Sequence, residues 1–329
     1  AAIDGAATFS STLTVGVDDT GYDVKFFGAT SGAYMLWDES ADDLKLVGAA
    51  GLTVAGDIDV DGTTNLDVVD VDGAVNFAAD VTFADGADII TASAGTSNFR
   101  AGVNAGNSIE SGGNYNVTIG DEAGTAITTG DNNVAVGYAA LDANTTASNN
   151  TAVGIAALGA NTTGHSNVAV GSYAGDALTG QESTAIGYNA LAAVTTASDN
   201  TGIGAYAGDA LTTGANNVAI GHYSLSAATT GASNTMVGGW AGDVITTGGS
   251  NVGIGQHALG ALTTVSNLVA VGTGALQANT TGTSNTAVGY TALDANTTGS
   301  NSVGVGHNAL GANTTGVHNV AVGYGALDA

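Results

Sequence analysis

A glycine that directly follows Val or Ile recurs thirteen times between residues 120 and 323 of this chain. Eleven of the twelve intervals between these glycines are 17 residues long, and one, from Gly171 to Gly187, is 16. Self-similarity at a short fixed period is typical of a solenoid, in which each repeat forms one coil and a core exists only because coils stack. The spacing therefore predicts an all-β fold, a parallel β-solenoid (β-roll) of about 13 coils with a 17-residue period.

The three residues before each glycine have the pattern of a short strand. The residue directly before the glycine is always Val or Ile, and the residue three before it is always Val or Thr. Apolar, β-branched residues two apart favour a pleated strand with both side chains on one face. We expect these side chains to stack from coil to coil in a ladder that includes Val136, Val153, Val170, Ile186, Ile203, Ile220 and Val237.

The other face of this strand is almost bare, because the residue between those two positions is Ala or Gly in eleven of the thirteen coils. Methyl groups alone cannot fill a core, so another backbone must come close to this face. That neighbour is either the opposite wall of the same coil or another chain. The alanines of this face are Ala135, Ala152, Ala169, Ala185, Ala219, Ala270, Ala287 and Ala321.

A compensation between two positions predicts the core of the opposite wall. The residue four after the glycine is Leu in nine coils and Gly in the other four. Each of those four glycines is followed three residues later by a large aliphatic side chain: Ile127, Leu178, Leu211 or Ile245. One bulky side chain per coil, supplied from either position, indicates a core of fixed volume. Asn stands four before the glycine in ten coils, where stacked amides can hydrogen-bond along the ladder.

Charge limits the possible partners. The chain has 29 acidic residues against Lys25, Lys45 and Arg100, and residues 101–329 contain no Lys or Arg. Such a surface cannot neutralise phosphates, which excludes nucleic-acid binding, and an anionic membrane would repel it. No apolar run approaches the ~20 residues that span a membrane, so we expect no membrane insertion. The absence of Cys excludes disulfides and thiolate metal sites.

The first hundred residues lack the period and predict different structures. We expect an N-terminal β module in residues 1–50, whose most aromatic stretch is 23–46, and an Asp-rich β shaft in 51–98. A Gly/Ser/Asn-rich junction is expected in 99–115, followed by the β-roll repeats in 116–329. The last coil breaks off in mid-repeat without a distinct cap, so we expect the polypeptide to continue or another subunit to cover this end.

Candidate sites for catalysis or metals are weak. Asp57, Asp59, Asp61 and Gly62 match the opening of an EF-hand loop, but Val68 stands where its bidentate Glu belongs, so acids on a wet strand face are the favoured interpretation. The five histidines never form a metal-ligand spacing. The acids of the repeats are scattered on turns, and no Ser/His/Asp group stands out. We therefore expect no enzymatic activity, no metal and no cofactor.

The position directly after the glycine varies freely, which indicates an outer surface. It holds several rings that form a candidate ligand-facing surface: Tyr138, Tyr188, His222, Tyr290, His307 and Tyr324. Such a strip can stack on sugars, although ordinary surface variation is the favoured interpretation.

Several strings resemble known repeats. NTAVG (150–154, 285–289), NVAVG (133–137, 167–171, 319–323) and GYAALDANTTASNN (137–150) resemble the left-handed parallel β-roll of trimeric autotransporter adhesin heads, and even more its longer versions in bacteriophage tail fibres. The segment DVKFFGATSGAYMLWDESADDLKL (23–46) is similar to N-proximal tail-fibre segments. The resemblance implies a homotrimer whose rolls pack around one axis, with the Ala/Gly strand face as the candidate trimer-packing face.

The function that the resemblance implies is structural: a trimeric phage tail fibre, extracellular and part of the virion tail, that projects or forms a host receptor-binding region. Its partners would be two identical chains, other tail or fibre proteins at the ends, and a cell-surface glycan or protein receptor. The alternative is a bacterial surface adhesin or an extracellular filament subunit. A remote alternative is an ice-binding solenoid, motivated by columns of Thr such as Thr145, Thr162 and Thr280. Adjacent Thr pairs are expected to point to opposite faces, which argues against a flat two-column array.

Overall fold

The computed structural model describes residues 24–27, 33–38, 43–47 and 94–328, and within these residues every regular element is a β-strand. The chain divides into two compact units, Ala1–Thr82 and Phe83–Ala329. The predicted shaft lies outside the described residues up to residue 93, as do Asp57, Asp59, Asp61 and Gly62.

The first unit contains a three-stranded antiparallel sheet, which agrees with the β module expected there. Its strands are β1 (Val24–Phe27), β2 (Tyr34–Asp38) and β3 (Asp43–Val47), in the order β1-β2-β3. Pairing of Phe27 with Tyr34 brings two rings to 6.4 Å between centroids. The Lys25 ammonium lies 3.3 Å from the centroid of the Tyr34 ring, so a cation–π contact adds to the strand pairing.

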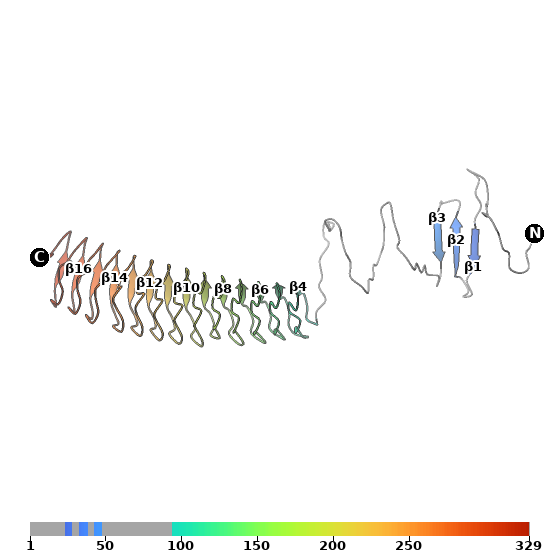
Figure 1. Ribbon diagram of the computed structural model, residues 1–329, viewed down its shortest axis with the longest axis horizontal. Coiled ribbons are helices and arrows are strands. Elements are labelled where there is room, and N and C mark those ends of the chain that lie inside the picture. The colour runs from blue at the N-terminus through green and yellow to red at the C-terminus, as the bar shows by residue number, and fades with distance from the viewer. Residues whose placement is uncertain (1–23, 28–32, 39–42, 48–93, 329) are drawn as a thin grey trace, which may run out of the picture. The chain divides into compact units, whose positions relative to one another are not determined.

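The second unit is a parallel β-solenoid, as the period predicts. Figure 1 shows its strands side by side, one per coil. They pair in chain order within one 14-stranded sheet, and each is three residues long. The strands are β4 (Phe99–Ala101), β5 (Val117–Ile119), β6 (Val134–Val136), β7 (Thr151–Val153), β8 (Val168–Val170), β9 (Thr184–Ile186), β10 (Thr201–Ile203), β11 (Val218–Ile220), β12 (Thr235–Val237), β13 (Val252–Ile254), β14 (Val269–Val271), β15 (Thr286–Val288), β16 (Val303–Val305) and β17 (Val320–Val322).

The register confirms the predicted ladder. Val136 pairs with Val153, Val153 with Val170, and Val170 with Ile186, so equivalent residues stack even across the one 16-residue interval. The column continues through Ile203 and Ile220 to Val237.

The stack begins earlier than the sequence indicated. β4 pairs in parallel with β5, so residues expected to form a junction (99–115) belong to the first coil. The strand Phe99–Ala101 lacks the Val or Ile before its glycine, which is why the repeat pattern missed it. Gly102 nevertheless has a positive φ of 135°, within the range of the equivalent glycines of the later coils.

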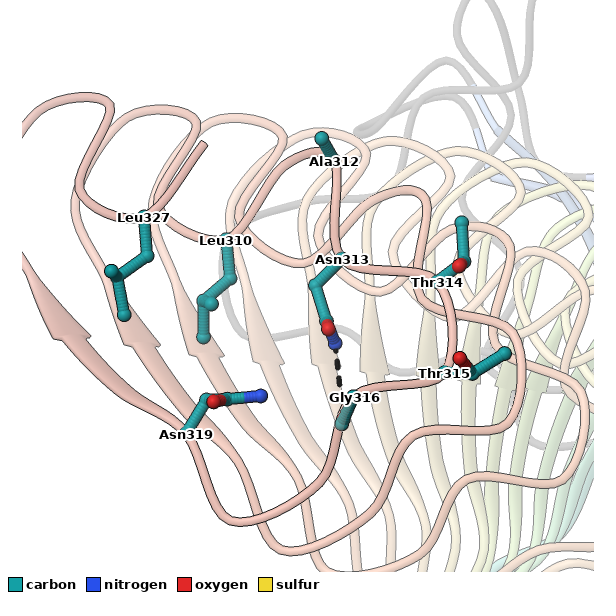
Figure 2. Close-up of a pocket in the computed structure, with 8 residues that line it drawn as sticks. All are labelled: Leu310, Ala312, Asn313, Thr314, Thr315, Gly316, Asn319 and Leu327. Carbon is teal, nitrogen blue, oxygen red and sulfur yellow. Dashed lines mark hydrogen bonds between the residues drawn. The ribbon is translucent and has the colours of Figure 1, made fainter. Parts of the chain in front are cut away.

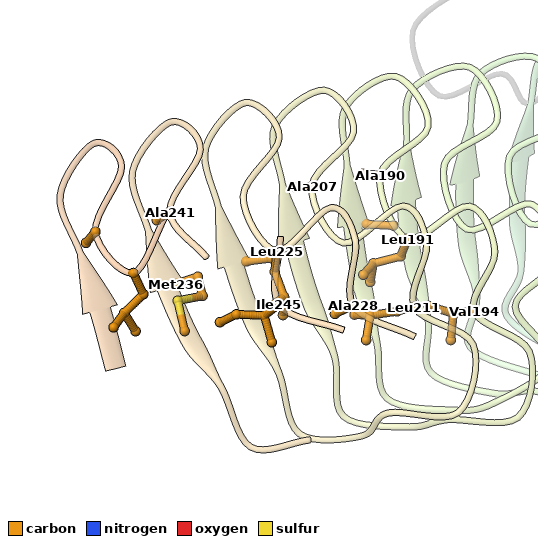
Figure 3. Packing of buried hydrophobic residues seen from close by; sticks show 14 of the residues in the cluster. Ala190, Leu191, Val194, Ala207, Leu211, Leu225, Ala228, Met236, Ala241 and Ile245 are labelled. Atoms are coloured by element: carbon orange, nitrogen blue, oxygen red, sulfur yellow. The ribbon is translucent and has the colours of Figure 1, made fainter. Parts of the chain in front are cut away.

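The core confirms the predicted compensation of volume. Leu141, Leu158 and Leu191 from one position, and Leu178 and Leu211 from the other, are fully buried. Figure 3 shows Leu191, Leu211, Leu225, Met236 and Ile245 one after another inside the stack. A large side chain in the strand is likewise accommodated by glycines at neighbouring positions. Met236 replaces Ala there, and its side chain occupies the space that a Cβ on Gly242 or Gly253 would need. Total volume per coil is therefore held nearly constant.

The small strand face packs against its own coil. A Cβ on Gly202 would lie 2.7 Å from Cγ of Leu191 and 3.0 Å from the carbonyl oxygen of Ala207, both on the opposite wall. The expectation that this face packs against another chain is therefore wrong. Its alanines are between 0 and 3 % exposed within the single chain: Ala135, Ala152, Ala169, Ala185, Ala219, Ala270, Ala287 and Ala321.

A buried ladder of Asn side chains runs beside the strands. Oδ1 of Asn116 accepts a hydrogen bond from the backbone N–H of Asn133, at 2.9 Å, and Oδ1 of Asn133 accepts from Asn150, at 3.0 Å. Nδ2 of Asn133 donates to the carbonyl oxygen of Ala147, at 2.9 Å. The Asn133 amide thus satisfies backbone groups 14 and 17 residues further along the chain, which makes a buried polar side chain favourable at this position.

Candidate functional site

The outward side of the long sheet is mainly apolar and partly exposed. It carries the Val/Ile and Val/Thr side chains that flank the buried alanines, and we call these two columns the outer sheet face. Ile186 is 38 % exposed and Ile254 is 39 % exposed. From β5 to β17 the face contains only Val, Ile and Thr. A long uncharged apolar face on a chain of net charge −26 is a candidate contact surface.

The rings predicted to face outward do so. Tyr138, Tyr188, Tyr290 and Tyr324 are between 47 and 84 % exposed, and His222 and His307 are exposed as well. They fall into different environments. Tyr290, His307 and Tyr324 stack face to face, with centroids 5.1 and 4.9 Å apart. Tyr188 and His222 instead join a second set of rings that the sequence analysis did not single out.

That second set comes from the next position along the chain, two after the glycine. Here Tyr206, Tyr223, Trp240 and His257 occupy four successive coils, all with φ between 53° and 58°. Together with Tyr188 and His222 they form a continuous group, which we call the aromatic ridge. The recurrence of rings at one position in four successive coils is visible in the sequence and would have identified it.

The geometry of the aromatic ridge alternates between stacked and perpendicular pairs. Tyr206 and Tyr223 are parallel, with centroids 4.8 Å apart and 1° between their planes, and Trp240 stacks on His257 at 5.5 Å. Tyr188 stands at 82° to Tyr206, and His222 at 83° to Trp240. Both arrangements are favourable for aromatic quadrupoles. The rings therefore hold one another in place along five coils.

Carboxyl groups form a separate column, five residues after the glycine. Burial raises the pKa of Asp142, Asp176, Asp209, Asp243 and Asp294 above their usual value. Small residues separate the first four: Gly159, Ala192 and Ser226. A Cβ on Gly159 would lie 2.8 Å from Oδ1 of Asp176 and 3.5 Å from Oδ1 of Asp142, so these carboxylates lean over the glycine. The spacing keeps like charges from lying on adjacent coils.

The carboxyl column does not provide a metal centre. Across the described parts of the chain, no group of three or more His, Asp or Glu side chains lies close enough together to hold a metal ion. Oδ1 of Asp209 and Oδ1 of Asp243 are buried without a hydrogen-bond partner, so no protein group replaces the water that these oxygens lose.

Two Thr columns run along the corner that follows the opposite wall. The paired threonines lie in a bend and not in a strand, and Thr162 and Thr163 are both exposed. Hydroxyls of the first column are engaged within the stack. Oγ1 of Thr280 donates a hydrogen bond to the carbonyl oxygen of Thr297 at 3.1 Å. Oγ1 of Thr297 donates to the carbonyl oxygen of Thr314 at the same distance.

A pocket of about 330 Å³ opens at the C-terminal coil. Figure 2 shows its lining: Leu310, Ala312, Asn313, Thr314, Thr315, Gly316, Asn319 and Leu327. Nδ2 of Asn313 donates to the carbonyl oxygen of Gly316 at 3.3 Å, a bond that the coils before it repeat. None of these side chains is titratable, so the pocket offers no acid, base or metal ligand.

Comparison with protein-family models, with curated proteins and with solved structures finds no match for this chain. In the part of the chain that the structure describes, no helix has the length and hydropathy needed to cross a membrane. The functional argument therefore depends on the surfaces themselves, which are the outer sheet face and the aromatic ridge.

Proposed function

We propose that the chain is a structural and attachment protein, one subunit of a homotrimeric phage tail fibre that is extracellular and part of the virion tail. The outer sheet face is the observation that carries this proposal. Its most exposed side chains are Ile119, Val168, Val170, Ile186, Ile254, Val288, Val320 and Val322, and every other Val, Ile or Thr of the two columns is partly exposed. Burial of such a face against other chains would remove a continuous apolar surface from water.

Identical chains are the occupants that fit this face best. Its columns are in exact coil register over the whole stack, so a second copy offers the same period and the same chemistry at every coil. Homo-oligomers are usually closed by symmetry. Three copies, each turning this face toward a common axis, would enclose it completely, in keeping with the trimeric proteins that the repeats resemble.

The chemistry of the surfaces favours attachment over catalysis. The carboxyl groups of the column lie on separate coils, and Asp142 and Asp176 are two coils apart. Hydrolysis of a glycosidic bond by paired carboxylates needs two such groups to converge on one substrate in a cleft. A rod with exposed rings suits contact with a receptor instead. The resemblance to adhesin heads keeps a bacterial surface adhesin or filament subunit as the alternative.

The mass of the full chain in solution tests the trimer. Light scattering after size exclusion should give three times the chain mass of 31.5 kDa. Replacement of two face residues, Ile203→Asp with Ile220→Asp, should yield smaller species, because each chain would place carboxylates in the shared interface. The matched control is Thr213→Asp with Thr230→Asp, which adds the same charge at exposed positions in the same two coils. A wild-type chain that runs at 31.5 kDa contradicts the proposal.

Electron microscopy of the complete assembly separates the two settings. Tail or baseplate proteins bound to the N-terminal unit support the phage fibre. A repeating head-to-tail contact between copies of this chain supports the bacterial filament.

A further inference from the structure

The aromatic ridge has a relief that the rest of the stack lacks. Along the position directly after the glycine, its five coils carry Tyr188, Ala205, His222, Gly239 and Gln256. Projecting side chains thus alternate with short ones, and the rings of Tyr206, Tyr223 and Trp240 lie beside them. The result is a corrugated aromatic surface with a period of two coils.

The deepest part of this relief is at Gly239. A Cβ built on Gly239 would have only one neighbouring atom within 4 Å, the carbonyl oxygen of His222 at 3.9 Å. A Cβ on Gly238, its neighbour in the chain, would instead lie 2.7 Å from the carbonyl oxygen of Gly255. The space over Gly239 is therefore open, with His222 and Gln256 on the coils to either side and Trp240 next in the chain. We call it the Gly239 notch.

The rings around the notch are held rigidly. The backbone N–H of Trp240 donates to the carbonyl oxygen of His222 at 2.9 Å, and that of Tyr206 donates to Tyr188 at the same distance. Left-handed backbone is costly for large L-residues, by roughly 1–2 kcal/mol each. Gly and Asn, which tolerate it best, occupy the same position at Asn189 and Gly274. The left-handed backbone therefore disfavours rings at these four successive positions. We infer that the contacts of the ring side chains offset this cost.

The charges around the aromatic ridge restrict its ligand. None of the ten residues one or two positions after the glycine in these coils is Asp, Glu, Lys or Arg. The carboxyl of Asp243 lies near enough to His257 to interact with it electrostatically, and the chain has no Lys or Arg after Arg100. Anionic ligands are therefore repelled. The imidazoles, the phenol hydroxyls and the Gln256 amide supply hydrogen-bond donors and acceptors.

We propose that the aromatic ridge binds a neutral glycan chain, with one sugar ring seated in the Gly239 notch beside Trp240. A pyranose has apolar C–H faces and hydroxyl-bearing edges, which match the partly exposed rings and the hydrogen-bonding side chains beside the notch. Sugars further along the chain would contact Tyr223 and Tyr206. This inference rests on the proposed attachment function and gives its ligand a chemical class.

Affinity electrophoresis of the full chain tests the ligand class. The gels contain a neutral polysaccharide (dextran, laminarin or galactomannan), sulfated heparin or cationic chitosan. At least one neutral polysaccharide should retard the chain, and heparin should not. Binding by none of the three neutral polysaccharides overturns the inference, as does retardation by heparin or by chitosan alone.

Two substitutions locate the site. Gly239→Tyr fills the notch without removing a ring, and Tyr is native at the same position in Tyr188 and Tyr290, so the fold should tolerate it. Gly239→Tyr and Trp240→Ala should each weaken binding by about tenfold or more, as removal of a central aromatic contact does. The control is Tyr173→Ala, an exposed ring at the position of Trp240 but outside the aromatic ridge. Unchanged binding by Gly239→Tyr, or an equal loss in Tyr173→Ala, contradicts the proposed site.

Fluorescence supplies a second measurement. The chain contains only two tryptophans, Trp37 and Trp240, so in a Trp37→Phe background all tryptophan emission comes from the notch. The retarding polysaccharide should shift that emission, and an unchanged spectrum at saturation argues against contact with Trp240.

Failure of this inference can be told from failure of the proposed function. A trimer that adheres to cells but ignores neutral glycans removes the inference alone. A monomeric chain that still binds glycan at the notch removes the trimeric fibre and leaves the site.

Discussion

Gly137 faces Gly154 of the next coil so closely that a Cβ on Gly137 would lie 2.5 Å from the carbonyl oxygen of Gly154. The same contact is repeated by Gly154 on Gly171, at 2.4 Å. These glycines also have φ values of 130° and 136°, where L-residues are strained. The glycine in each coil is thus required twice, by its backbone conformation and by the spacing of the stack.

Gly154→Ala should therefore destabilise the rod. We expect the free energy of unfolding to fall by about 1–3 kcal/mol from backbone strain, with a further loss from the clash with Gly171. Urea denaturation followed by circular dichroism measures this. Gly239→Ala is the matched control, because the same substitution there meets open space. Equal stability of the two variants would show that the close approach is not limiting.

A swap of core volume between positions tests the compensation. Gly208→Leu alone should overpack the coil, since a Cβ there would lie 2.9 Å from Cδ2 of Leu191 and 3.0 Å from Cδ1 of Leu211. Leu211→Asn alone should leave a cavity, and costs of about 2–5 kcal/mol are usual for such losses. The double variant recreates the Leu and Asn pattern of Leu158 and Asn161, so it should recover most of the stability. A double-mutant cycle from urea denaturation gives the coupling, and strictly additive losses would contradict a shared volume.

The Asn ladder predicts a pH-dependent variant. Oδ1 of Asn217 accepts from the backbone N–H of Asn234 at 3.0 Å, and its Nδ2 donates to the carbonyl oxygen of Gly231 at 2.9 Å. Asn217→Asp removes the donor and places a charge in a buried site, so it should be strongly destabilising at pH 7. Protonation restores a donor, and thermal unfolding should therefore show partial recovery in acid. Asn216→Asp, at the exposed neighbouring position, should change little at either pH.

The carboxyl column predicts that acid stabilises the rod. Burial raises the pKa of Asp142, Asp176, Asp209, Asp243 and Asp294 above the ordinary aspartate value of 3.8. The folded state then binds protons more readily than the unfolded state, so stability rises as pH falls through the raised pKa values toward 3.8 and is lost again as pH rises.

Thermal melts of the wild type between pH 7 and pH 4 measure the effect, and Asp176→Asn should reduce the gain in Tm. Asp199→Asn, at an exposed turn, controls for the change in net charge. A Tm that falls steadily with acidification would contradict a destabilising role for the buried carboxyls.

Periodicity made the coil, its register and its core volumes predictable. Val136, Val153 and Val170 stack as expected, because a strict period leaves equivalent residues no other neighbours. It did not show which strand face is inside. Alternation separates two faces but left open whether Ala135 packs against the opposite wall of its own coil or against another chain. Met236 in the Ala column could have shown that this face points inward, because glycines at 242 and 253 leave room for its side chain.

The aromatic ridge was only half predictable. Tyr188 and His222 follow a Gly and were identified as outward rings, but Tyr206 and Trp240 stand one residue further along. Their left-handed backbone is set by hydrogen bonds to the preceding coil, and their own residue types do not favour it. Contacts between rings of adjacent coils, such as that of Trp240 with His222, depend on this backbone conformation and cannot be read from the sequence spacing.

The hydrogen bonds between coils run along the axis of the stack, because each coil pairs only with the coils before and after it. A pull on the two ends of one rod would stretch these bonds in series, one coil boundary after another. Extra coils would lengthen such a rod without strengthening it, and its tensile limit would be that of its weakest boundary. Lateral association along the outer sheet face would let neighbouring chains share the force.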